Sequence, residues 1–129
     1  MTQENTKLIA QELGLRLSYG VKIRVNDKIE TVEGINILDN IVEFGTYMAC
    51  DIDEVKPYLF PFSNMTEEQK KETSKMFWDF DNNEFTNDTE FVDHCDCFNL
   101  IDWLNKNHFD YRGLISKGLA LDATGLGIY

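Results

Sequence analysis

The chain has 129 residues, of which 43% are hydrophobic and 27% charged, and its formal net charge is −11 at pH 7. A chain of this size buries enough apolar surface to fold as one domain, residues 1–129. No stretch reaches the roughly 18 apolar residues of a membrane span, and MTQENTKLIAQ lacks the features of a signal peptide. We therefore expect a soluble protein that stays in the cytoplasm.

The N-terminal segment predicts a short amphipathic helix. Leu8, Ile9 and Leu13 fall at helical spacing, and Gly14 follows them. Because glycine is common just after the last turn of a helix, we expect the helix to end there. Residues 1–19 would then form this helix and the lead-in to the next element.

Residues 20–62 predict a small antiparallel sheet that ends in a connector. The segment VKIRVN alternates apolar and polar residues, as a half-buried strand does. Turn signals then separate three further short strands, IETVEGIN, IVEF and TYMACDI. Such a meander closes most easily as an SH3-like barrel, since a flat sheet leaves one face and both edges unprotected; an open sheet backed by helices is the alternative. The segment DEVKPYLFPF, with Pro57 and Pro61, is expected to be the connector.

Residues 63–129 predict a helical part and an extended tail. Thr66 and Gln69 have the spacing of a capping box, and the helix they start is expected to run to about Trp78. A similar signal at residues 87–90 starts a second helix, which continues to His108. The buried stripe of this second helix should contain Phe91, Cys95, Phe98, Ile101 and Leu104.

The last segment, FDYRGLISKGLALDATGLGIY, predicts a capped turn and then extended chain. Asp110 is suited to cap a short turn, and Gly118 to interrupt the chain before the tail. The fold class is therefore α+β: an N-terminal helix, a small SH3-like antiparallel sheet or barrel, and two C-terminal helices.

Three stretches, in their order, resemble a known group of proteins. LSYGVK, IDEVKPYLFPFSNMTEEQKKE and IDWLNKNHFDYRGLISKGLALDATGLGIY are similar to stretches of small proteins from phages and prophages of gut Bacteroidetes. Members of that group pair a KPYLRPMSSMTEEE block with a C-terminal HFDYRGLIEKGLALEA block. The resemblance implies an accessory protein of a phage or mobile element, in the cytoplasm of its bacterial host, and brings no catalytic residues. The chain departs from the group at Ser18, where proline is usual, and at Phe60, where arginine is usual.

The negative charge is concentrated in the middle of the chain. Residues 51–96 contain thirteen acidic and four basic residues, whereas residues 1–50 contain seven and five. Between Asp79 and Asp96 there are seven acids and no Lys or Arg. A surface of this sign repels phosphate backbones and attracts basic protein surfaces. We therefore expect a host or phage protein with a basic surface as partner, and no direct nucleic-acid binding.

The segment DFDNNEFTNDTE has the ligand spacing of a calcium-binding loop. Oxygen-bearing side chains fall at loop positions 1, 3, 5, 9 and 12, which are Asp79, Asp81, Asn83, Asn87 and Glu90. The sixth position, where a sharp turn favours glycine, is Glu84. A capped polar linker is the simpler interpretation, because Asp and Asn side chains bond to local backbone. We therefore expect no metal or cofactor, and a calcium-binding helix-loop-helix is an alternative function.

Zinc binding and catalysis have weaker support. His94, Cys95, Cys97 and His108 are potential zinc ligands, but Cys95 and Cys97 point about 200° apart around a helix and do not easily share one metal. His94 and Cys97 could share a metal, but two ligands do not make a structural site. The chain has three cysteines, Cys50, Cys95 and Cys97, and this odd number argues against a disulfide framework and favours a reducing compartment. No serine or cysteine stands in a recognisable nucleophile setting. We expect no enzymatic activity and no catalytic residues.

Binding of a partner protein is the function that these observations favour. Acidic and aromatic side chains of the helical part suit a docking face for a basic protein. The residues assigned to this face are Asp79, Asp81, Glu84, Asp88, Glu90, Asp93 and Asp96. A sharper form is an anti-CRISPR-like inhibitor of a host defence complex, whose carboxylates mimic a nucleic-acid backbone; the alternative is a self-associating assembly component. Four aromatic residues of the sheet and connector form either an apolar patch on the barrel or its lid: Tyr47, Tyr58, Phe60 and Phe62.

Overall fold

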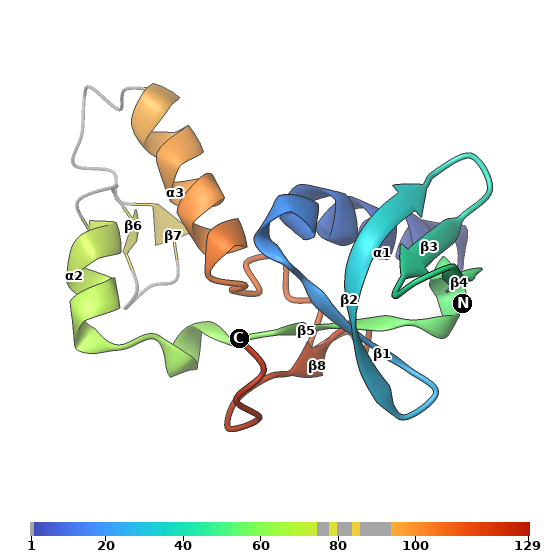
Figure 1. Ribbon diagram of the computed structural model, residues 1–129. Helices are drawn as coiled ribbons and strands as arrows, with labels where there is room; N and C mark the ends of the chain where they lie inside the picture. The colour runs from blue at the N-terminus through green and yellow to red at the C-terminus, as the bar shows by residue number, and fades with distance from the viewer. Residues whose placement is uncertain (1, 75–77, 80–83, 86–93) are drawn as a thin grey trace.

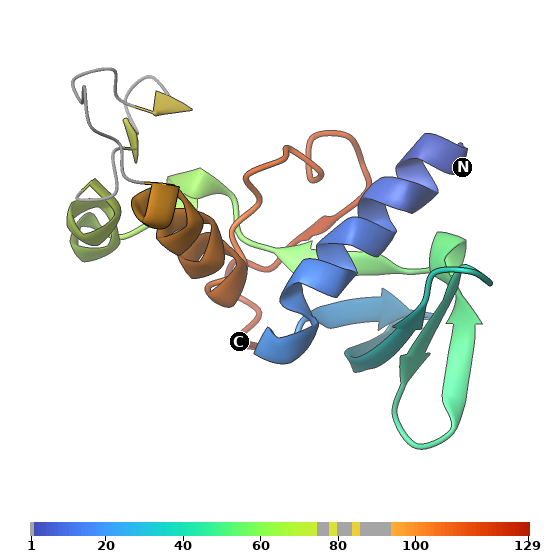
Figure 2. The same cartoon turned by 90° about the horizontal axis from the view of Figure 1, so that it is seen from above.

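The protein is described here from a computed structural model of residues 1–129, in which one mixed sheet is covered on one face by a helix (Figures 1 and 2). The structure describes residues 2–74, 78–79, 84–85 and 94–129, with side chains for 2–73 and 99–129. The strand order in the sheet is β4-β3-β2-β1-β5-β8. The elements of the sheet and its cover are α1 (Gln3–Arg16), η1 (Leu17–Tyr19), β1 (Lys22–Val25), β2 (Lys28–Asn36), β3 (Ile41–Phe44), β4 (Met48–Asp51), η2 (Ile52–Glu54), β5 (Lys56–Leu59) and β8 (Leu121–Asp122). The elements beside them are η3 (Phe62–Asn64), α2 (Glu67–Ser74), β6 (Trp78–Asp79), β7 (Glu84–Phe85) and α3 (His94–Lys106).

The meander β1 to β4 follows the turn signals of the sequence. Asn26 and Asp27 both have positive φ, 48° and 67°, and join β1 to β2 by a two-residue turn of the kind that hairpins favour. Positive φ values at Asn40 and Gly45 mark the next two turns. The four predicted strands and the places of their turns are confirmed.

Part of the expected connector, Lys56–Leu59, is in fact β5, an interior strand of the sheet between β1 and β8. β5 pairs antiparallel with β1 and parallel with β8, so the sheet is mixed and the prediction of a purely antiparallel sheet is wrong. Pro57, which pairs with Ile23 of β1, lies outside the β5–β8 pairing, which starts at Tyr58. Proline is tolerated there because its missing N–H is on the unpaired side of the strand.

The sheet is open in the part of the chain that the structure describes. β4 and β8 stand at the two ends of the strand order and do not pair with each other. The broader α+β class is confirmed by the N-terminal helix, the sheet and the further helices, whereas a closed SH3-like barrel is not.

Helix α1 continues past the residue at which it was expected to stop. Gly14 lies inside the helix, which ends at Arg16. Glycine costs roughly 1 kcal/mol in a helix interior relative to alanine. The buried pairing of Arg16 with Glu12, one turn earlier, stabilises the last turn and explains why the helix does not end at Gly14.

The helical part agrees with its first capping signal and differs beyond it. The Thr66 hydroxyl accepts a hydrogen bond from the Gln69 N–H at 3.2 Å, and the Gln69 side chain accepts from the Thr66 N–H at 2.9 Å, which confirms the capping box. Helix α2 ends at Ser74, so the expectation that it runs to Trp78 is wrong. Trp78 instead belongs to β6 and pairs with Phe85 of β7.

Helix α3 ends at Lys106 rather than at the predicted His108. The Phe109 N–H donates to the Leu104 carbonyl and the His108 N–H to the Asn105 carbonyl, which is the pattern of a Schellman motif. His108 occupies the left-handed position of this motif, with φ 61°, where glycine is usual. Of the predicted stripe, Leu104 is buried as expected and Ile101 is half-buried, whereas Leu100, which was not predicted, is fully buried. The side chains of Phe91, Cys95 and Phe98 lie outside the described part of the chain.

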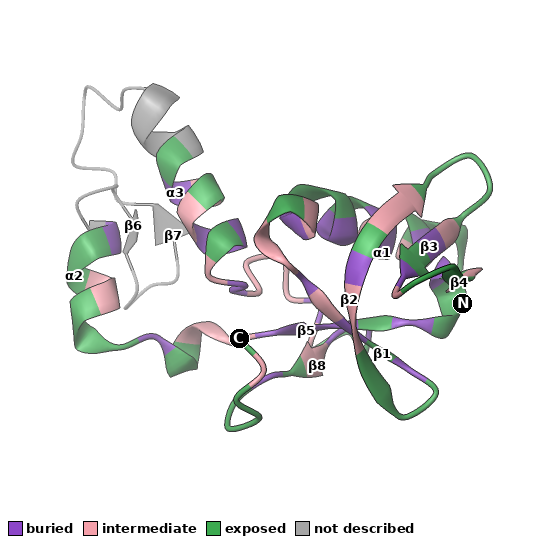
Figure 3. Cartoon of the chain, in the orientation of Figure 1, coloured by how far each residue is buried: buried purple, intermediate pink, exposed green. Residues whose placement is uncertain are grey.

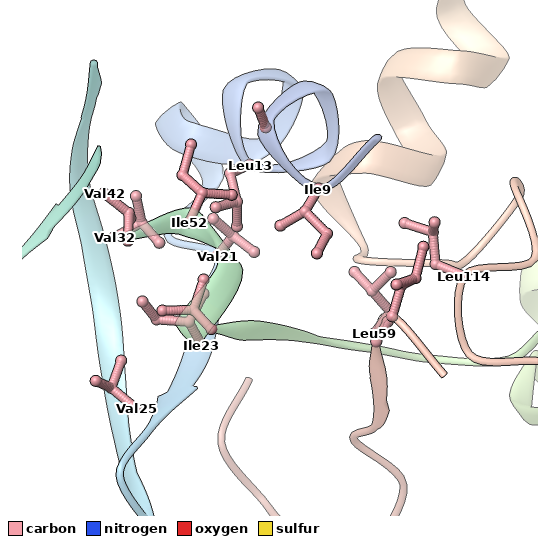
Figure 4. Packing of buried hydrophobic residues seen from close by; sticks show 14 of the residues in the cluster. Ile9, Leu13, Val21, Ile23, Val25, Val32, Val42, Ile52, Leu59 and Leu114 are labelled. Carbon is pink, nitrogen blue, oxygen red and sulfur yellow. The ribbon is translucent and has the colours of Figure 1, made fainter. Parts of the chain in front are cut away.

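Two hydrophobic clusters hold the described part of the chain together. In the larger one, Ile9 and Leu13 of α1 pack on side chains of the sheet, and Leu114 packs from the C-terminal segment (Figure 4). The smaller one lies under α3 and contains Met65, Leu100, Leu104 and Phe109. Burying a side chain of this size contributes roughly 1.5–3 kcal/mol, so the larger cluster is the main source of stability.

The C-terminal segment bears out the remaining local signals. The Asp110 carboxylate accepts hydrogen bonds from the N–H groups of Leu114 and Ile115, both at 2.9 Å, and so caps a turn as predicted. Gly118 has φ 74° and precedes β8, the short strand that pairs with β5.

Candidate protein-binding site

A cleft with two carboxylates opens on the outer side of the sheet. It has a volume of about 360 Å³ and is lined by residues of β2, β3, β4 and the turn between β3 and β4. The lining residues are Glu33, Glu43, Gly45, Tyr47, Met48 and Ala49. Acidic, aromatic and thioether groups therefore line one small hollow.

Glu43 lies flat across the neighbouring strand because that strand has a glycine opposite it. Gly34 pairs with Glu43, and a Cβ atom added to Gly34 would lie 2.7 Å from the Glu43 Oε2 atom. The pairing shifts register between Val32 and Gly34, so β2 is locally irregular here. The missing side chain at Gly34 therefore leaves the space that the Glu43 carboxylate occupies.

Tyr47 is exposed in an unfavourable backbone conformation. Its φ is 63°, in the left-handed region that bulky residues rarely adopt. Its relative solvent exposure is 100%, so the rest of the described chain covers none of it. Non-glycine residues in this region cost of order 1 kcal/mol and concentrate at functional sites.

Strand β4 leaves one edge of the sheet unpaired. It pairs with β3 alone among the described strands, and Figure 2 shows it as the outermost strand on its side. Met48 is 56% exposed beside Tyr47. The turn between β2 and β3 adds two exposed apolar side chains, Ile37 and Leu38, and Figure 3 shows that turn as exposed along its length.

The end of the sheet that contains the cleft is acidic. Residues 27–54 include eight acidic residues and a single basic one, Lys28. Glu33, Glu43 and Asp51 are all exposed. A charge count over residues 1–50 hides this excess of acidic residues, because the four other basic residues in that range lie before residue 27. Charge counted by strand would have identified this surface from the sequence.

The structure describes the predicted acidic face only in part. Asp79 and Glu84 are register partners in the backbone pairing of β6 with β7, and Asp96 lies in α3. Four other assigned residues lie outside the described part of the chain: Asp81, Asp88, Glu90 and Asp93.

A calcium-binding helix-loop-helix requires a helix directly before its loop. Here α2 ends at Ser74, and Asp79, the first loop position, lies in strand β6 with Trp78. The loop positions Asp81, Asn83, Asn87 and Glu90 lie outside the described residues. Within the described residues, no three His, Cys, Asp or Glu side chains are grouped in a way that could hold a metal ion.

The four aromatic residues expected to form one patch or lid are separated. Tyr58 is buried, whereas Phe60 and Phe62 pack on the smaller cluster below α3. Tyr47 lies at the cleft. Only Tyr47 of the four is therefore presented fully to solvent.

A second hollow, of about 540 Å³, lies where the sheet meets the helical part, and His108 lines it. The imidazole stacks on Tyr129 with ring centroids 3.7 Å apart, and its Nδ1 atom is buried without a hydrogen-bond partner among the described residues. Burial, and secondarily the nearby Arg16, lowers the pKa of His108 to about 4. A neutral, stacked imidazole of this kind is a structural contact between α3 and the C-terminal segment.

The HFDYRGL segment attaches the C-terminal part to helix α1. Arg16 donates to the Phe109 carbonyl at 2.6 Å, and the guanidinium groups of Arg16 and Arg112 both lie over the Tyr111 ring. Arg112 also pairs with Glu12 at 3.2 Å. The segment that supports the resemblance therefore has a structural role that its residue types alone do not reveal.

No helix in the described residues is long and apolar enough to cross a membrane. Comparisons with protein-family models, with curated proteins and with solved structures gave no match to this chain.

Proposed function

We propose that this chain acts by binding a protein with a basic surface, as a non-enzymatic accessory protein of a phage or mobile element in the bacterial cytoplasm. The observation that supports the proposal is the acidic cleft of Glu33 and Glu43, which lies beside the exposed Tyr47 and beside β4, a strand that pairs with β3 alone in the described part of the chain. Acidic residues at such a surface speed encounter with a basic partner and select against nucleic acid.

The finer fold assignment is part of the same proposal: strands β1 to β5 form an SH3-like unit, and α2 and α3 are its C-terminal helices. Three features support it. β1 pairs with both β2 and β5; β2 continues beyond its irregular region to pair with β3; and the short helix η2 directly precedes β5. The cleft lies on the face of the sheet away from α1, because Glu43 alternates along β3 with Val42 and Phe44, which pack with α1 in the larger cluster.

The sharper form of the function is inhibition of a host defence complex by occupation of a basic channel. Two acidic segments support it. Residues 27–54 contain eight acidic residues and one basic residue, and residues 79–96 contain seven acidic residues and no Lys or Arg. Contacts between many charge pairs weaken steeply with salt, since the Debye length falls from about 10 Å at 0.1 M to about 3 Å at 1 M.

The test is affinity purification of the tagged chain from a bacterial host, with identification of the bound proteins by mass spectrometry at 0.1 M and 0.5 M salt. We expect a protein with a basic surface that is retained at low salt and largely lost at high salt. A complex whose affinity does not change with salt would rule out the nucleic-acid mimic, and no retained protein would contradict partner binding altogether.

Self-association is the competing function, because an unpaired strand edge can pair with a second copy. Light scattering at rising protein concentration separates the two. A monomer at all concentrations favours binding of a different protein, and a concentration-dependent dimer that persists in 0.5 M salt favours assembly.

A further inference from the structure

We propose that the partner supplies an extended basic segment, which adds as a new strand to the free edge of β4 and places an arginine or lysine side chain in the Glu33–Glu43 cleft. The inference rests on the proposed function and specifies how the partner is recognised. It assigns the binding to the sheet.

The backbone of β4 provides the first half of this recognition. A strand at the end of a sheet presents unpaired N–H and C=O groups, and an extended peptide that pairs with them gains main-chain hydrogen bonds whatever its sequence. β4 has four residues, and its neighbour on one side is β3. β4 contains no proline and no lysine, and its one charged residue, Asp51, repels an acidic strand but attracts a basic one.

The register of the sheet provides the second half. Gly34, Glu43 and Ala49 lie opposite one another on three successive strands, so their side-chain positions form one row across the outer face. Ala49 has only a methyl group, which leaves the path from an added strand to Glu43 open. An added residue opposite Ala49 stands two strand spacings from Glu43, roughly 10 Å, and only a long side chain such as Arg or Lys covers this distance.

The cleft at the end of that row suits a cation. Glu33 and Glu43 supply two carboxylates, and Tyr47 supplies an aromatic ring at the rim. A guanidinium binds carboxylates through paired hydrogen bonds and also stacks on aromatic faces. A bound partner would also cover Tyr47, whose unfavourable φ has no compensating contact in the described chain.

A second copy of the chain is a poorer occupant than a basic segment. Pairing of two β4 strands would join two sheet ends of the same sign, since residues 27–54 of each copy contain eight acidic residues and one basic residue. Like charges brought together at an interface disfavour the association.

The experiment uses the whole protein and a peptide with carboxyfluorescein on its N-terminus, carboxyfluorescein-Val-Arg-Val-Arg-Val-Arg-Val-amide, with binding measured by fluorescence anisotropy. Two further peptides have N-methyl groups on every valine or on every arginine. Because alternate residues of a strand point their N–H groups to opposite sides, strand addition predicts that one N-methylated peptide loses at least about tenfold in affinity while the other keeps it. Equal affinity of all three peptides would overturn strand addition.

The second arm tests the cleft. We expect Glu43→Gln and Ala49→Leu each to weaken binding of the unmodified peptide about tenfold, because one removes a carboxylate and the other blocks the path to it. Glu68→Gln, an exposed position on α2, removes the same charge away from the cleft and should change the affinity less than twofold. Equal losses for Glu43→Gln and Glu68→Gln would show general charge attraction and overturn the assignment of the cleft. Amide spectra of each variant verify that the fold is unchanged.

The same variants separate failure of this inference from failure of the proposed function. If the native chain and Glu43→Gln recover the same host protein in equal amount, partner binding holds and recognition at β4 is wrong. If neither recovers a protein while the peptide binds as expected, the proposed function fails and the peptide-binding edge stands.

Discussion

Glu12 and Arg16 form an ion pair that is almost completely shielded from solvent. The Arg16 Nε atom lies 2.9 Å from Glu12 Oε2, and the two side chains are 0% and 1% exposed. Burial raises the pKa of Glu12 even though Arg16 and Arg112 oppose the shift. A second contact of Arg16, its bond to the Phe109 carbonyl, joins α1 to a segment 93 residues further along the chain.

Removing one member of this pair should destabilise the protein strongly. Arg16→Met leaves the Glu12 carboxylate buried with Arg112 alone, and such a change typically costs about 3–5 kcal/mol. Urea unfolding of Arg16→Met, Glu12→Gln and the double variant measures the effect. We expect the double variant to be less destabilised than the sum of the two single variants, because the second change removes the uncompensated charge. Additive losses would show that the pair does not act as a unit.

Stability should fall with acid in a window set by His108. The unfolded chain binds a proton at this residue below pH 6.5, whereas the folded chain does so only below about 4. The free energy of unfolding therefore decreases as the pH falls from 6.5 to 4, by up to about 3 kcal/mol from this group.

His108→Asn is the matched control for this window, because asparagine also tolerates the left-handed backbone. The difference in unfolding free energy between the native chain and this variant should change across pH 4–6.5 and stay constant above pH 7.5. A difference that is independent of pH would contradict the lowered pKa.

Tyr129→Phe should destabilise the chain by about 1–2 kcal/mol. The Tyr129 hydroxyl accepts from the Lys22 N–H at 2.7 Å and donates to the Tyr58 carbonyl at 2.8 Å, so it bridges β1 and β5. Burial raises the pKa of Tyr129 to about 12. Thermal unfolding measures the stability loss, and ultraviolet titration of the native chain should show one tyrosine ionising near pH 12 that is missing in the variant.

Tyr47→Asn should make the isolated protein more stable by roughly 0.5–1 kcal/mol, since asparagine adopts the left-handed conformation at lower cost. The same variant should bind the arginine-valine peptide more weakly, because it removes the aromatic rim of the cleft. Denaturant unfolding and anisotropy on one preparation test both effects. Loss of stability together with loss of binding would indicate a structural role for the Tyr47 ring.

Gly34→Ala should leave the fold intact and displace the Glu43 carboxylate. The new Cβ atom would lie 2.7 Å from the end of a flexible, exposed side chain, which can rotate away. We expect a change in unfolding free energy below about 0.5 kcal/mol, with peptide affinity reduced as in Glu43→Gln. Unchanged affinity would mean that the position of Glu43 over Gly34 does not matter for binding.

Local signals predicted a large part of the fold. The Asn26–Asp27 turn, the Thr66–Gln69 capping box and the Asp110 cap depend on hydrogen bonds within a few residues, so the sequence pattern is sufficient for them. The predictions failed where contacts between distant parts of the chain decide whether a segment is helix, strand or loop. Gly14 remains helical because Arg16 has buried partners, and the Pro57 segment becomes a strand because β1 pairs with it.

The candidate site shows the same division. The sequence shows the acidic residues of 27–54 and the turn residues between the strands of the sheet. Whether Glu33, Glu43 and Tyr47 meet depends on strand register, and a shift by one residue would send Glu43 to the opposite face.

By itself, the sequence determined the sign and uneven distribution of charge, the turns and caps, and the α+β class, because these depend on composition and on neighbours along the chain. Only the tertiary structure decided that β4 is an edge strand among the described residues, that Gly34 makes room for Glu43, and that Arg16 is buried against residues of the C-terminal segment. The physical reason is that these features depend on strand pairing and on packing between segments far apart in sequence, which local patterns do not encode.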